Sequence, residues 1–310
     1  MILVVGGTGT LGRPVVSRLM ANGLPVRVFT RRPEAVPAEW ADRVEHTTGD
    51  VRSPGDLAAA MSGVDMVVSL IQGFGSPERD ALQTIDLQGN ANVIDAAAAS
   101  GASVVLLSIV RADSQSRIEL FRVKHDAEQH LRRSGAPWTV VRATAYMETW
   151  LDLMEQTAAD GGRPLVFGHG RNPINFVAAD DVAALVERCV VDPSTRRLSL
   201  QIGGPENLTL NRVAAAAQRA AGRTGPPRHV SRATLRMMAA TMGRFQPLYA
   251  RQARLALLMD TADMTFDSAP LHATLPGLPV TTLREALAAR TTSTPRTAAS
   301  AVRQESPLAR

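Results

Sequence analysis

Three glycines near the amino terminus, Gly6, Gly9 and Gly12, are spaced as in a turn that binds phosphate. They follow the apolar residues 2–5, which predict a buried strand, and they precede a helical pattern over residues 13–22. Gly6 and Gly9 allow backbone angles and a close approach that a β-carbon forbids, and Gly12 lets the helix pack tightly on the strand. The N–H groups at the helix start, at the positive end of its dipole, would bind a pyrophosphate. The alternative is a tight turn without a ligand. The turn residues expected at the phosphates are Gly6, Thr8, Gly9, Thr10, Leu11 and Gly12.

Two arginines follow the next predicted strand, residues 25–30, at the place where a dinucleotide-binding fold holds the adenosine ribose. NAD-binding proteins usually have Asp or Glu here, whereas this chain has Arg31 and Arg32. A guanidinium binds a 2′-phosphate through two charge-assisted hydrogen bonds, and a carboxylate would repel it. These residues favour NADP(H) over NAD(H), with Arg31 the stronger candidate. The alternative is that both arginines are solvated surface charges.

Strands and helices alternate through the first half of the chain, which predicts a doubly wound parallel α/β sheet of the Rossmann type. Predicted strands cover residues 2–5, 25–30, 44–47, 64–70, 103–108 and 138–142. Predicted helices cover residues 13–22, 54–61, 80–100 and 118–133, with Ser53 as N-cap of the second and Gly101 ending the third. Cofactors of such sheets bind at the carboxyl ends of the strands. Beyond the glycine turn and Arg31, that edge would carry Asp50, Val51, Leu70 and Ile71, all expected at the cofactor, together with Ser108 and residues 143–146.

The second half has a looser pattern. Helices are predicted over residues 148–159, 180–191, 210–221 and 235–259, and a strand over 198–202. Asp180 is expected as an N-cap, Thr209 precedes the third of these helices, and the last is broken near Gly243 and Pro247. Its methionines are typical of adaptable core packing or, alternatively, of an apolar pocket wall. We expect a nucleotide-binding core in residues 1–145, a small substrate lobe in 146–290 with some elements returning to the core, and a disordered tail in 291–310.

The composition narrows the class of protein. The chain has 310 residues, 45% of them hydrophobic, which is typical of a soluble globular protein with an ample core. Its net charge of +5 comes from scattered residues, mostly arginine, and only 4% of the residues are aromatic. We therefore interpret the charge as attraction for an anionic cofactor rather than for nucleic acid. Cys189 is the only cysteine, so it is expected in the core, and no disulfide or metal site is predicted.

The chain has neither a signal peptide pattern nor an apolar run of about 18 residues, the length that a membrane span needs. A cytoplasmic protein without a membrane partner is therefore expected.

Several motifs together resemble the NmrA-like group of atypical short-chain dehydrogenases/reductases. The turn GGTGTLG over residues 6–12 resembles that group's opening motif. The segments FRVKHDAE over 121–128 and SGAPWTVVR over 134–142 are similar to its helix and to a following strand. Further matches are FVAADDVA over 176–183 and IGGPE over 202–206. The resemblance spans residues 1–290 and implies a Rossmann domain with a small carboxyl-terminal lobe, binding NADP(H) or, less often, NAD(H).

The resemblance also implies a role for Lys124, which matches the helix lysine expected to contact the nicotinamide ribose. A lysine there can donate hydrogen bonds and lower the pKa of a neighbouring acid; the alternative is an exposed helix lysine. Members that reduce carbonyls in the ordinary way carry Tyr four residues earlier, and this chain has Leu120. Leucine cannot give a proton, so the usual acid pair is absent.

Three other groups are candidate proton donors. Tyr146 follows the sixth strand, where the resemblance implies the floor of the substrate pocket; its alternative role is an aromatic wall. Ser108 ends the fifth strand, and its commonest role there is a backbone cap. His125 neighbours Lys124 but faces a different way along the helix, so we expect it outside the pocket. The catalytic candidates are thus Lys124, Tyr146 and Ser108.

Two functions remain open at this point. One is an NADPH-dependent oxidoreductase that passes hydride to a small apolar electrophile, such as a quinone, an enone or a ketone. The other is a non-catalytic NADP(H) sensor that acts through a protein partner, which the loss of Tyr at position 120 favours. Neither the substrate nor the oligomeric state can be derived from the residues.

Overall fold

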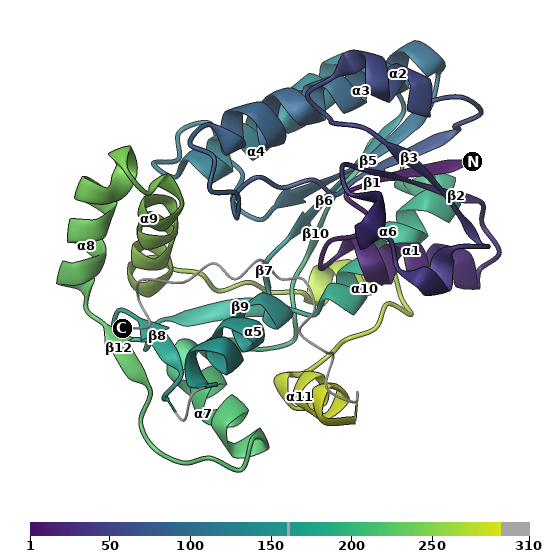
Figure 1. The fold of residues 1–310 in the computed structure, drawn as a ribbon. Coiled ribbons are helices and arrows are strands. Elements are labelled where there is room, and N and C mark those ends of the chain that lie inside the picture. Colours follow the sequence, from purple (N-terminus) through teal and green to yellow (C-terminus); the bar gives the residue numbers. More distant parts are fainter. Residues whose placement is uncertain (160–161, 293–310) are drawn as a thin grey trace.

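A parallel sheet of seven strands forms the centre of the computed structural model, which describes residues 1–159 and 162–292 (Figure 1). Its strands are β1 (Ile2–Val5), β2 (Val26–Thr30), β3 (Val44–Thr48), β4 (Met66–Ser69), β5 (Ser103–Ile109), β6 (Trp138–Ala143) and β10 (Ser199–Ile202). The strand order is β10-β6-β5-β4-β1-β2-β3, and every neighbouring pair is parallel. All carboxyl ends therefore lie at one edge, and the predicted fold class is confirmed.

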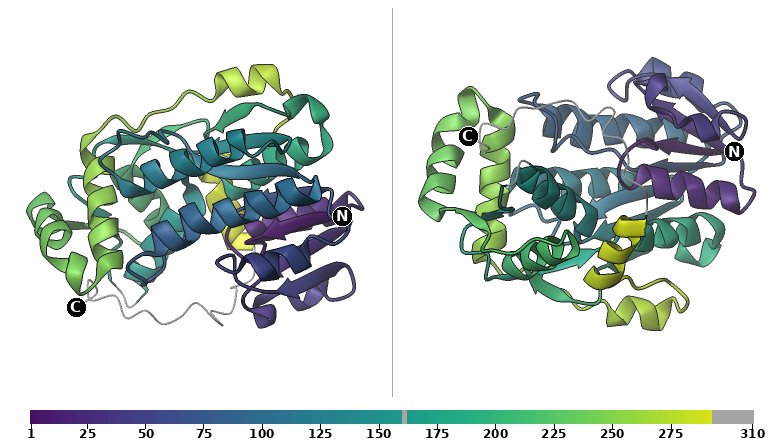
Figure 2. Two further views of the ribbon diagram at one scale, coloured as in Figure 1. Left: turned by 90° about the horizontal axis from the view of Figure 1, so that it is seen from above. Right: turned by 60° about the horizontal axis from the view of Figure 1, so that its bottom comes forward.

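Helices cover both faces of this sheet and complete two hydrophobic cores (Figures 1 and 2). On one face lie α1 (Gly12–Ala21) and α6 (Ala179–Val191). On the other lie α2 (Pro54–Ala60), α3 (Gln88–Ser100) and α4 (Glu119–Arg133). Because both faces are covered, the inner strands are apolar at consecutive positions rather than at alternate ones.

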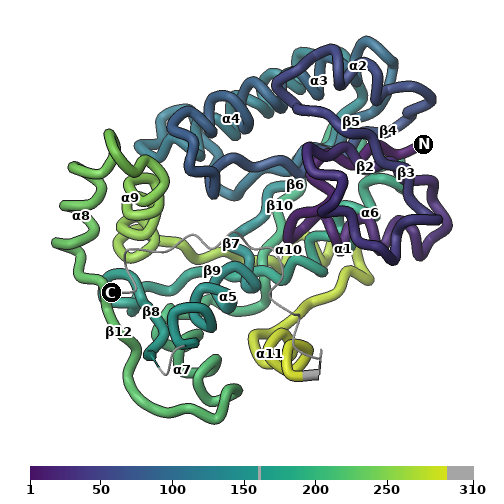
Figure 3. The backbone as a smooth tube through the Cα atoms, in the orientation of Figure 1, coloured from purple at the N-terminus to yellow at the C-terminus, as the bar shows by residue number. Residues whose placement is uncertain are grey.

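The second half of the chain forms a smaller lobe beside the carboxyl edge of the main sheet (Figure 3). The lobe contains two small sheets, with strand orders β11-β9-β7 and β12-β8. Its elements are β7 (Ala145–Tyr146), α5 (Met147–Ala158), β8 (Leu165–Phe167), β9 (Pro173–Val177), β11 (Asn207–Thr209), α7 (Leu210–Ala220), β12 (Arg228–Val230), α8 (Arg232–Thr241), α9 (Pro247–Thr261) and α11 (Leu283–Thr292). Helix α10 (Ala269–Thr274) packs instead on the main sheet, where Leu271 and Leu275 join the core that also contains α1 and α6. Between β9 and β11 the chain returns to the main sheet and adds α6 and β10, so the lobe is not a contiguous stretch of sequence.

Local signals in the sequence account for several element ends. The Ser53 hydroxyl accepts a hydrogen bond from the Asp56 N–H and caps α2, as predicted. Gly101 ends α3 in the left-handed region with φ 75°, where glycine is favoured. The predicted break near Gly243 and Pro247 separates α8 from α9. Cys189 is buried, as expected of a small core residue.

Two predicted elements differ from the structure. Asp180 is not an N-cap, because α6 begins one residue earlier and the Glu148 carboxylate from α5 accepts the hydrogen bond of the Ala179 N–H at 3.0 Å. The stretch predicted as one helix over 80–100 begins with a π-helical segment, η3 (Leu82–Leu87), before α3. Asp86 lies in this segment, four residues before the buried Asn90, and its side chain has no exposed surface. The short strands β7, β8, β9, β11 and β12 and the helices α10 and α11 were not predicted.

Helix α11 continues to Thr292, so the first two residues of the predicted tail 291–310 are helical. The rest of that tail, residues 293–310, lies outside the described residues. Within the ranges 1–159 and 162–292, no helix is both long and apolar enough to cross a membrane.

Candidate functional site

The glycine turn between β1 and α1 is packed so closely that its shape depends on glycine. A β-carbon built on Gly12 would lie 2.1 Å from the Gly6 carbonyl oxygen, and Gly6 itself has φ 88°. The first residue before the helix, Leu11, provides no side-chain cap, and the first turn of α1 holds no acidic residue. The Gly9 and Arg13 N–H groups donate to the Gly6 and Gly9 carbonyls, so the amides between them, of residues 10–12, are the ones that could bind an anion. The turn in this form fits the pyrophosphate of a dinucleotide.

The residues predicted at the phosphates divide into two sets. Gly9 and Thr10 are exposed and Thr8 is partly exposed, so they form the open surface of the turn. The side chain of Leu11 is buried in the core, which leaves only its backbone to face a ligand. Residues 70 and 71 close the other side of the turn, because a β-carbon on Gly6 would lie 3.2 Å from the Leu70 carbonyl carbon.

The end of β2 presents two arginines to solvent. The Thr30 hydroxyl is nearly buried and accepts a hydrogen bond from the Arg32 N–H at 3.1 Å, which fixes the turn after the strand. The side chains of Arg31 and Arg32 are exposed, and within the described ranges neither has an ion-pair partner. Cations without a carboxylate partner at this place suit an anionic group on the adenosine.

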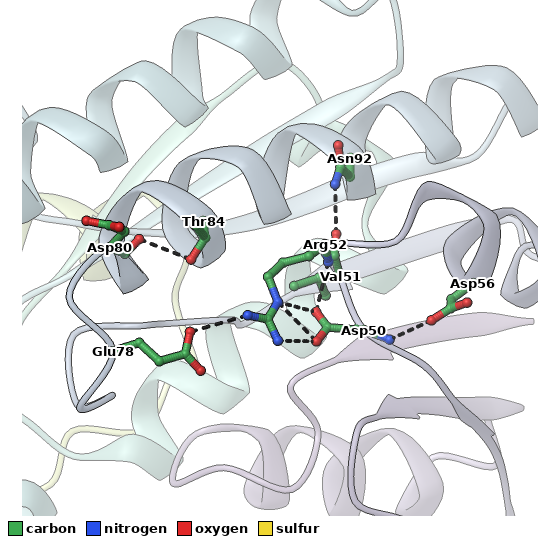
Figure 4. Close-up of polar contacts among 8 residues, drawn as sticks. All are labelled: Asp50, Val51, Arg52, Asp56, Glu78, Asp80, Thr84 and Asn92. Carbon is green, nitrogen blue, oxygen red and sulfur yellow. Dashed lines mark hydrogen bonds and ion pairs between the residues drawn. The ribbon is translucent and has the colours of Figure 1, made fainter.

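The end of β3 carries an ion-pair bridge (Figure 4). Asp50 accepts hydrogen bonds from the Arg52 side chain, from Nε at 3.0 Å and from Nη2 at 2.6 Å, and from the Arg52 backbone N–H at 2.9 Å, and these lower the pKa of the Asp50 carboxyl. The same guanidinium reaches Glu78 through Nη1 at 3.3 Å. The neighbouring Val51 has a buried side chain, and its carbonyl accepts a hydrogen bond from the Asn92 side chain at 2.9 Å. The predicted cofactor contact Asp50 thus lies at the carboxyl edge, paired with Arg52.

Lys124 lies deep at the same edge, with 2% of its surface exposed. Its Nζ is 3.0 Å from Asp86 Oδ1 and donates a hydrogen bond to the Ile71 carbonyl at 3.1 Å. The other Asp86 oxygen accepts a hydrogen bond from the Gly73 N–H at 2.7 Å. A buried ammonium needs such a partner because desolvation of an unpaired charge is costly. The hydrogen bond to Ile71 uses one of the three N–H donors of Lys124, and the contact with Asp86 Oδ1 is an ion pair without a hydrogen bond. Lys124 therefore has donors left for a ligand.

Ser108 is held away from the role of a proton donor. Its hydroxyl donates a hydrogen bond of 2.6 Å to Glu128, a carboxylate with no exposed surface. Arg142 binds the same carboxylate through Nε and Nη2, and this hydrogen bonding raises the pKa of the Arg142 guanidinium. The network joins β5, α4 and β6, so the partner of Ser108 is a side-chain carboxylate and not the backbone.

A cavity of 580 Å³ opens between the sheet edge and the lobe. The Rossmann core contributes Thr10, Ser108 and Lys124 to its lining. Its apolar lining side chains come from core and lobe together: Phe74, Leu107, Ile109, Leu120, Phe121, Trp150, Leu153, Phe167, Leu255, Met259, Met264 and Phe266. Of the methionines in the helical stretch predicted over 235–259, Met238 packs in a core cluster, and Met259 belongs to a core cluster and also lines the cavity. A second cation, Arg111, also lines the cavity and has φ 72°, which is uncommon for a residue with a side chain.

Tyr146 also lines this cavity, and its ring packs against the core. Its hydroxyl is buried and finds no hydrogen-bond partner among the described residues. Burial, with a smaller contribution from the negative charge of Glu148, raises the pKa of Tyr146. The phenol therefore stays protonated, and its hydrogen is available for a bond to a ligand.

His125 lies outside the cavity, as expected, and its ring pairs with Asp126 on the outside of α4. In the part of the chain that the structure describes, no group of three or more His, Cys, Asp or Glu side chains is placed to hold a metal ion.

Together, the parallel sheet, the glycine turn and the cavity at the carboxyl edge define a dinucleotide-binding protein of the Rossmann class. The NAD(P)H-binding family model matches residues 6–193, which is more than half of the chain, and the chain belongs to this family. The resemblance to NmrA-like short-chain dehydrogenases/reductases is thereby confirmed.

Proteins with similar sequences include both a reductase and an assembly factor. The NAD(P)H azoreductase of Xenophilus azovorans is 31% identical over 232 residues, which cover 74% of this chain and 77% of that protein. The photosystem II assembly factor Ycf39 of Synechocystis sp. is 27% identical over 278 residues, or 87% of this chain and 84% of that protein. Among solved structures, the NADPH-dependent quinone oxidoreductase QOR2 of Escherichia coli, complexed with NADPH, has a TM-score of 0.76 at 23% identity and covers 94% of this chain and 100% of that one. The similarity to this oxidoreductase shows that the two proteins share a fold.

Proposed function

We propose that the protein is an NADPH-dependent reductase of a small apolar electrophile, such as a quinone, an enone or a ketone. The observation that carries the proposal is the 580 Å³ cavity, mainly apolar at its wall, with the buried Lys124 ammonium at its edge. An apolar cavity with few polar groups selects an apolar ligand and orients it. A relative that is named an NAD(P)H azoreductase supports the same class of reaction.

The residues of the site supply positioning and hydrogen bonds. When bound, NADPH supplies the hydride. Hydride addition to a quinone, an enone or a ketone leaves negative charge on the acceptor oxygen, and Lys124 and Tyr146 are the donors that we assign to stabilise it. A quinone needs little acid, because its ring spreads the charge of the reduced anion. Leu120 in place of a tyrosine is therefore compatible with quinone reduction.

We infer a preference for NADP(H) over NAD(H) from the exposed guanidinium of Arg31. Arg31→Ala should weaken NADPH binding by about 10- to 100-fold, since a hydrogen bond to a charged group contributes about 1.5–3 kcal/mol. NADH binding should change little, because NADH has no 2′-phosphate. Calorimetric titration with both nucleotides measures this. The matched control is Arg43→Ala, which removes an exposed arginine just before β3, at the amino edge of the sheet. Equal weakening of both nucleotides by Arg31→Ala would refute the assignment.

The function itself is tested with purified protein, NADPH and a panel of quinones, enones and ketones, by following the loss of absorbance of the reduced nicotinamide. Turnover with at least one acceptor is expected. Absence of turnover with every acceptor, together with equally tight binding of oxidised and reduced cofactor, would instead support a sensor that acts through a protein partner. Leu120 at the usual tyrosine position and a relative named as an assembly factor favour that second function.

Tyr146→Phe tests the hydroxyl in the cavity. We expect kcat/KM to fall by about 2- to 10-fold, the contribution of one neutral hydrogen bond of about 0.5–1.5 kcal/mol. Stability should not fall, because the hydroxyl has no hydrogen-bond partner among the described residues. Steady-state kinetics and urea unfolding of the cofactor-free protein measure both quantities. Unchanged kinetics would show that Tyr146 only lines the pocket and that its hydroxyl has no role in turnover.

A further inference from the structure

The segment after β4, residues 72–80, runs between the nucleotide-binding core and the lobe, and both parts hold it. From the core, Asp86 accepts the hydrogen bond of the Gly73 N–H at 2.7 Å, and Arg52 pairs with the Glu78 carboxylate at 3.3 Å. From the lobe, Arg251 on α9 donates hydrogen bonds to the backbone of residues 76–79. The segment also contacts the lobe through Arg79, whose guanidinium donates a hydrogen bond of 2.7 Å to the Arg244 carbonyl between α8 and α9. We call residues 72–80 the strap.

Arg251 makes the largest set of contacts to the strap. Its Nη1 donates to the Glu78 and Arg79 carbonyls, each at 3.1 Å, and its Nη2 donates to the Ser76 carbonyl. The side chain is 7% exposed and has no carboxylate partner within the described ranges, and burial lowers the pKa of its guanidinium. The negative charges of Glu119 and Asp86 stabilise the Arg251 cation from a distance. Its hydrogen bonds go to three backbone carbonyls of the strap, so they hold the strap backbone in one shape.

The strap is a wall of the cavity. Gln72, Phe74 and Gly75 line it, and they face the lining residues Gln252, Leu255 and Ala256 of α9. Phe74 packs in one apolar cluster with Leu120 and Leu255. Arg251 is not a lining residue, so its side chain does not itself contact a ligand in the cavity.

We propose that Arg251 is a positioning residue that holds the strap as the wall of the substrate pocket and thereby sets which acceptors fit. This inference rests on the proposed reductase function. Substrate selection would then depend on a contact between core and lobe that lies outside the pocket. Loss of that contact should weaken acceptor binding more than NADPH binding, because Arg251 binds residues 76–79 of the strap, whereas residues 70 and 71 close the glycine turn.

The test compares Arg251→Gln with Arg254→Gln in the full chain. Arg254 lies one turn along α9, is exposed, and donates its hydrogen bond to the Ala239 carbonyl within the lobe, so it is a matched control. Hydrogen exchange of the amides of residues 72–80 reports the strap. Quenching of tryptophan fluorescence by 1,4-naphthoquinone reports acceptor binding without turnover, because Trp150 lines the cavity.

Arg251→Gln should speed exchange in residues 72–80 by at least about tenfold and raise the naphthoquinone Kd and KM by at least about fivefold, consistent with the loss of hydrogen bonds from a charged group. The NADPH Kd should stay within about twofold, and kcat should change less than KM. Arg254→Gln should match the wild type in all five quantities. Should Arg251→Gln fail to fold, Arg251→Lys replaces it, because lysine keeps the charge but cannot span three carbonyls.

Exchange and naphthoquinone affinity that are equal in the Arg251 and Arg254 variants would overturn the inference. Faster exchange with unchanged naphthoquinone affinity would overturn it as well, since the strap would then be held without affecting the pocket. A wild-type protein that reduces no acceptor would overturn the proposed function alone, because exchange and quenching do not require turnover.

Discussion

Lys124→Met should lower kcat/KM for quinone reduction by about 100-fold or more. Loss of one preorganised donor at a developing negative charge costs about 10²–10³ in rate, and the buried Nζ of Lys124 is such a donor at the cavity. Asp86→Asn keeps the lysine and an oxygen for the Gly73 N–H but leaves the buried ammonium without its ion-pair partner. It should therefore lower stability as well, and lower kcat/KM less than Lys124→Met does. Steady-state kinetics with NADPH and 1,4-naphthoquinone measure both variants.

Stability must be separated from chemistry in this experiment. Lys124→Met leaves Asp86 as a buried carboxylate without its ion-pair partner, and breaking a buried pair in this way costs about 3–5 kcal/mol. The double variant Lys124→Met/Asp86→Asn removes both charges and should recover much of that stability, as urea unfolding would show. Its activity should stay low. A double variant that binds NADPH and turns over like the wild type would show that Lys124 is a structural residue.

The sequence predicted the parts of the site that depend on local spacing. The glycine turn and Lys124 belong to sequence motifs that are a few residues long. Because all strands of the main sheet are parallel, both lie at its carboxyl edge. Asp86 was not predicted, although it lies four and seven residues before the buried Asn90 and Val93 and so on their side of the helix. Its role depends on Lys124, which comes from another helix. Arg251 was also missed, because its partners are carbonyl oxygens 172 to 175 positions away in the chain.

The lobe was predicted less well than the core for a physical reason. Core strands are buried on both faces and are apolar at consecutive positions, whereas lobe strands such as β7 and β12 have two and three residues. Strands this short carry almost no periodicity, and tertiary pairing creates them. Ser108 illustrates the same limit within the core. Its position at the strand end was predicted correctly, yet its partner Glu128 comes from a helix 20 positions later.

Gly12→Ala and Gly9→Ala should have different effects, although both glycines belong to the same turn. A β-carbon on Gly12 would lie 2.1 Å from the Gly6 oxygen and 2.6 Å from two Gly7 backbone atoms, so α1 would have to move. Such overpacking costs about 1–3 kcal/mol or more. We expect a lower free energy of unfolding for the cofactor-free protein and a loss of NADPH affinity of at least about 100-fold, since the helix start no longer meets the turn.

A β-carbon on Gly9 would meet only the Gly6 oxygen, at 3.4 Å, which is an ordinary contact. Gly9→Ala should therefore keep the stability of the cofactor-free protein and still weaken NADPH, because the exposed turn must let a pyrophosphate approach its backbone. Gly55→Ala, in α2, where a β-carbon has no neighbour closer than 4.0 Å, is the neutral control for both. Urea unfolding and calorimetric titration of the three variants separate the roles. If Gly9→Ala binds NADPH as tightly as the control does, the phosphates do not lie on this turn, and Gly12 serves the packing of α1 alone.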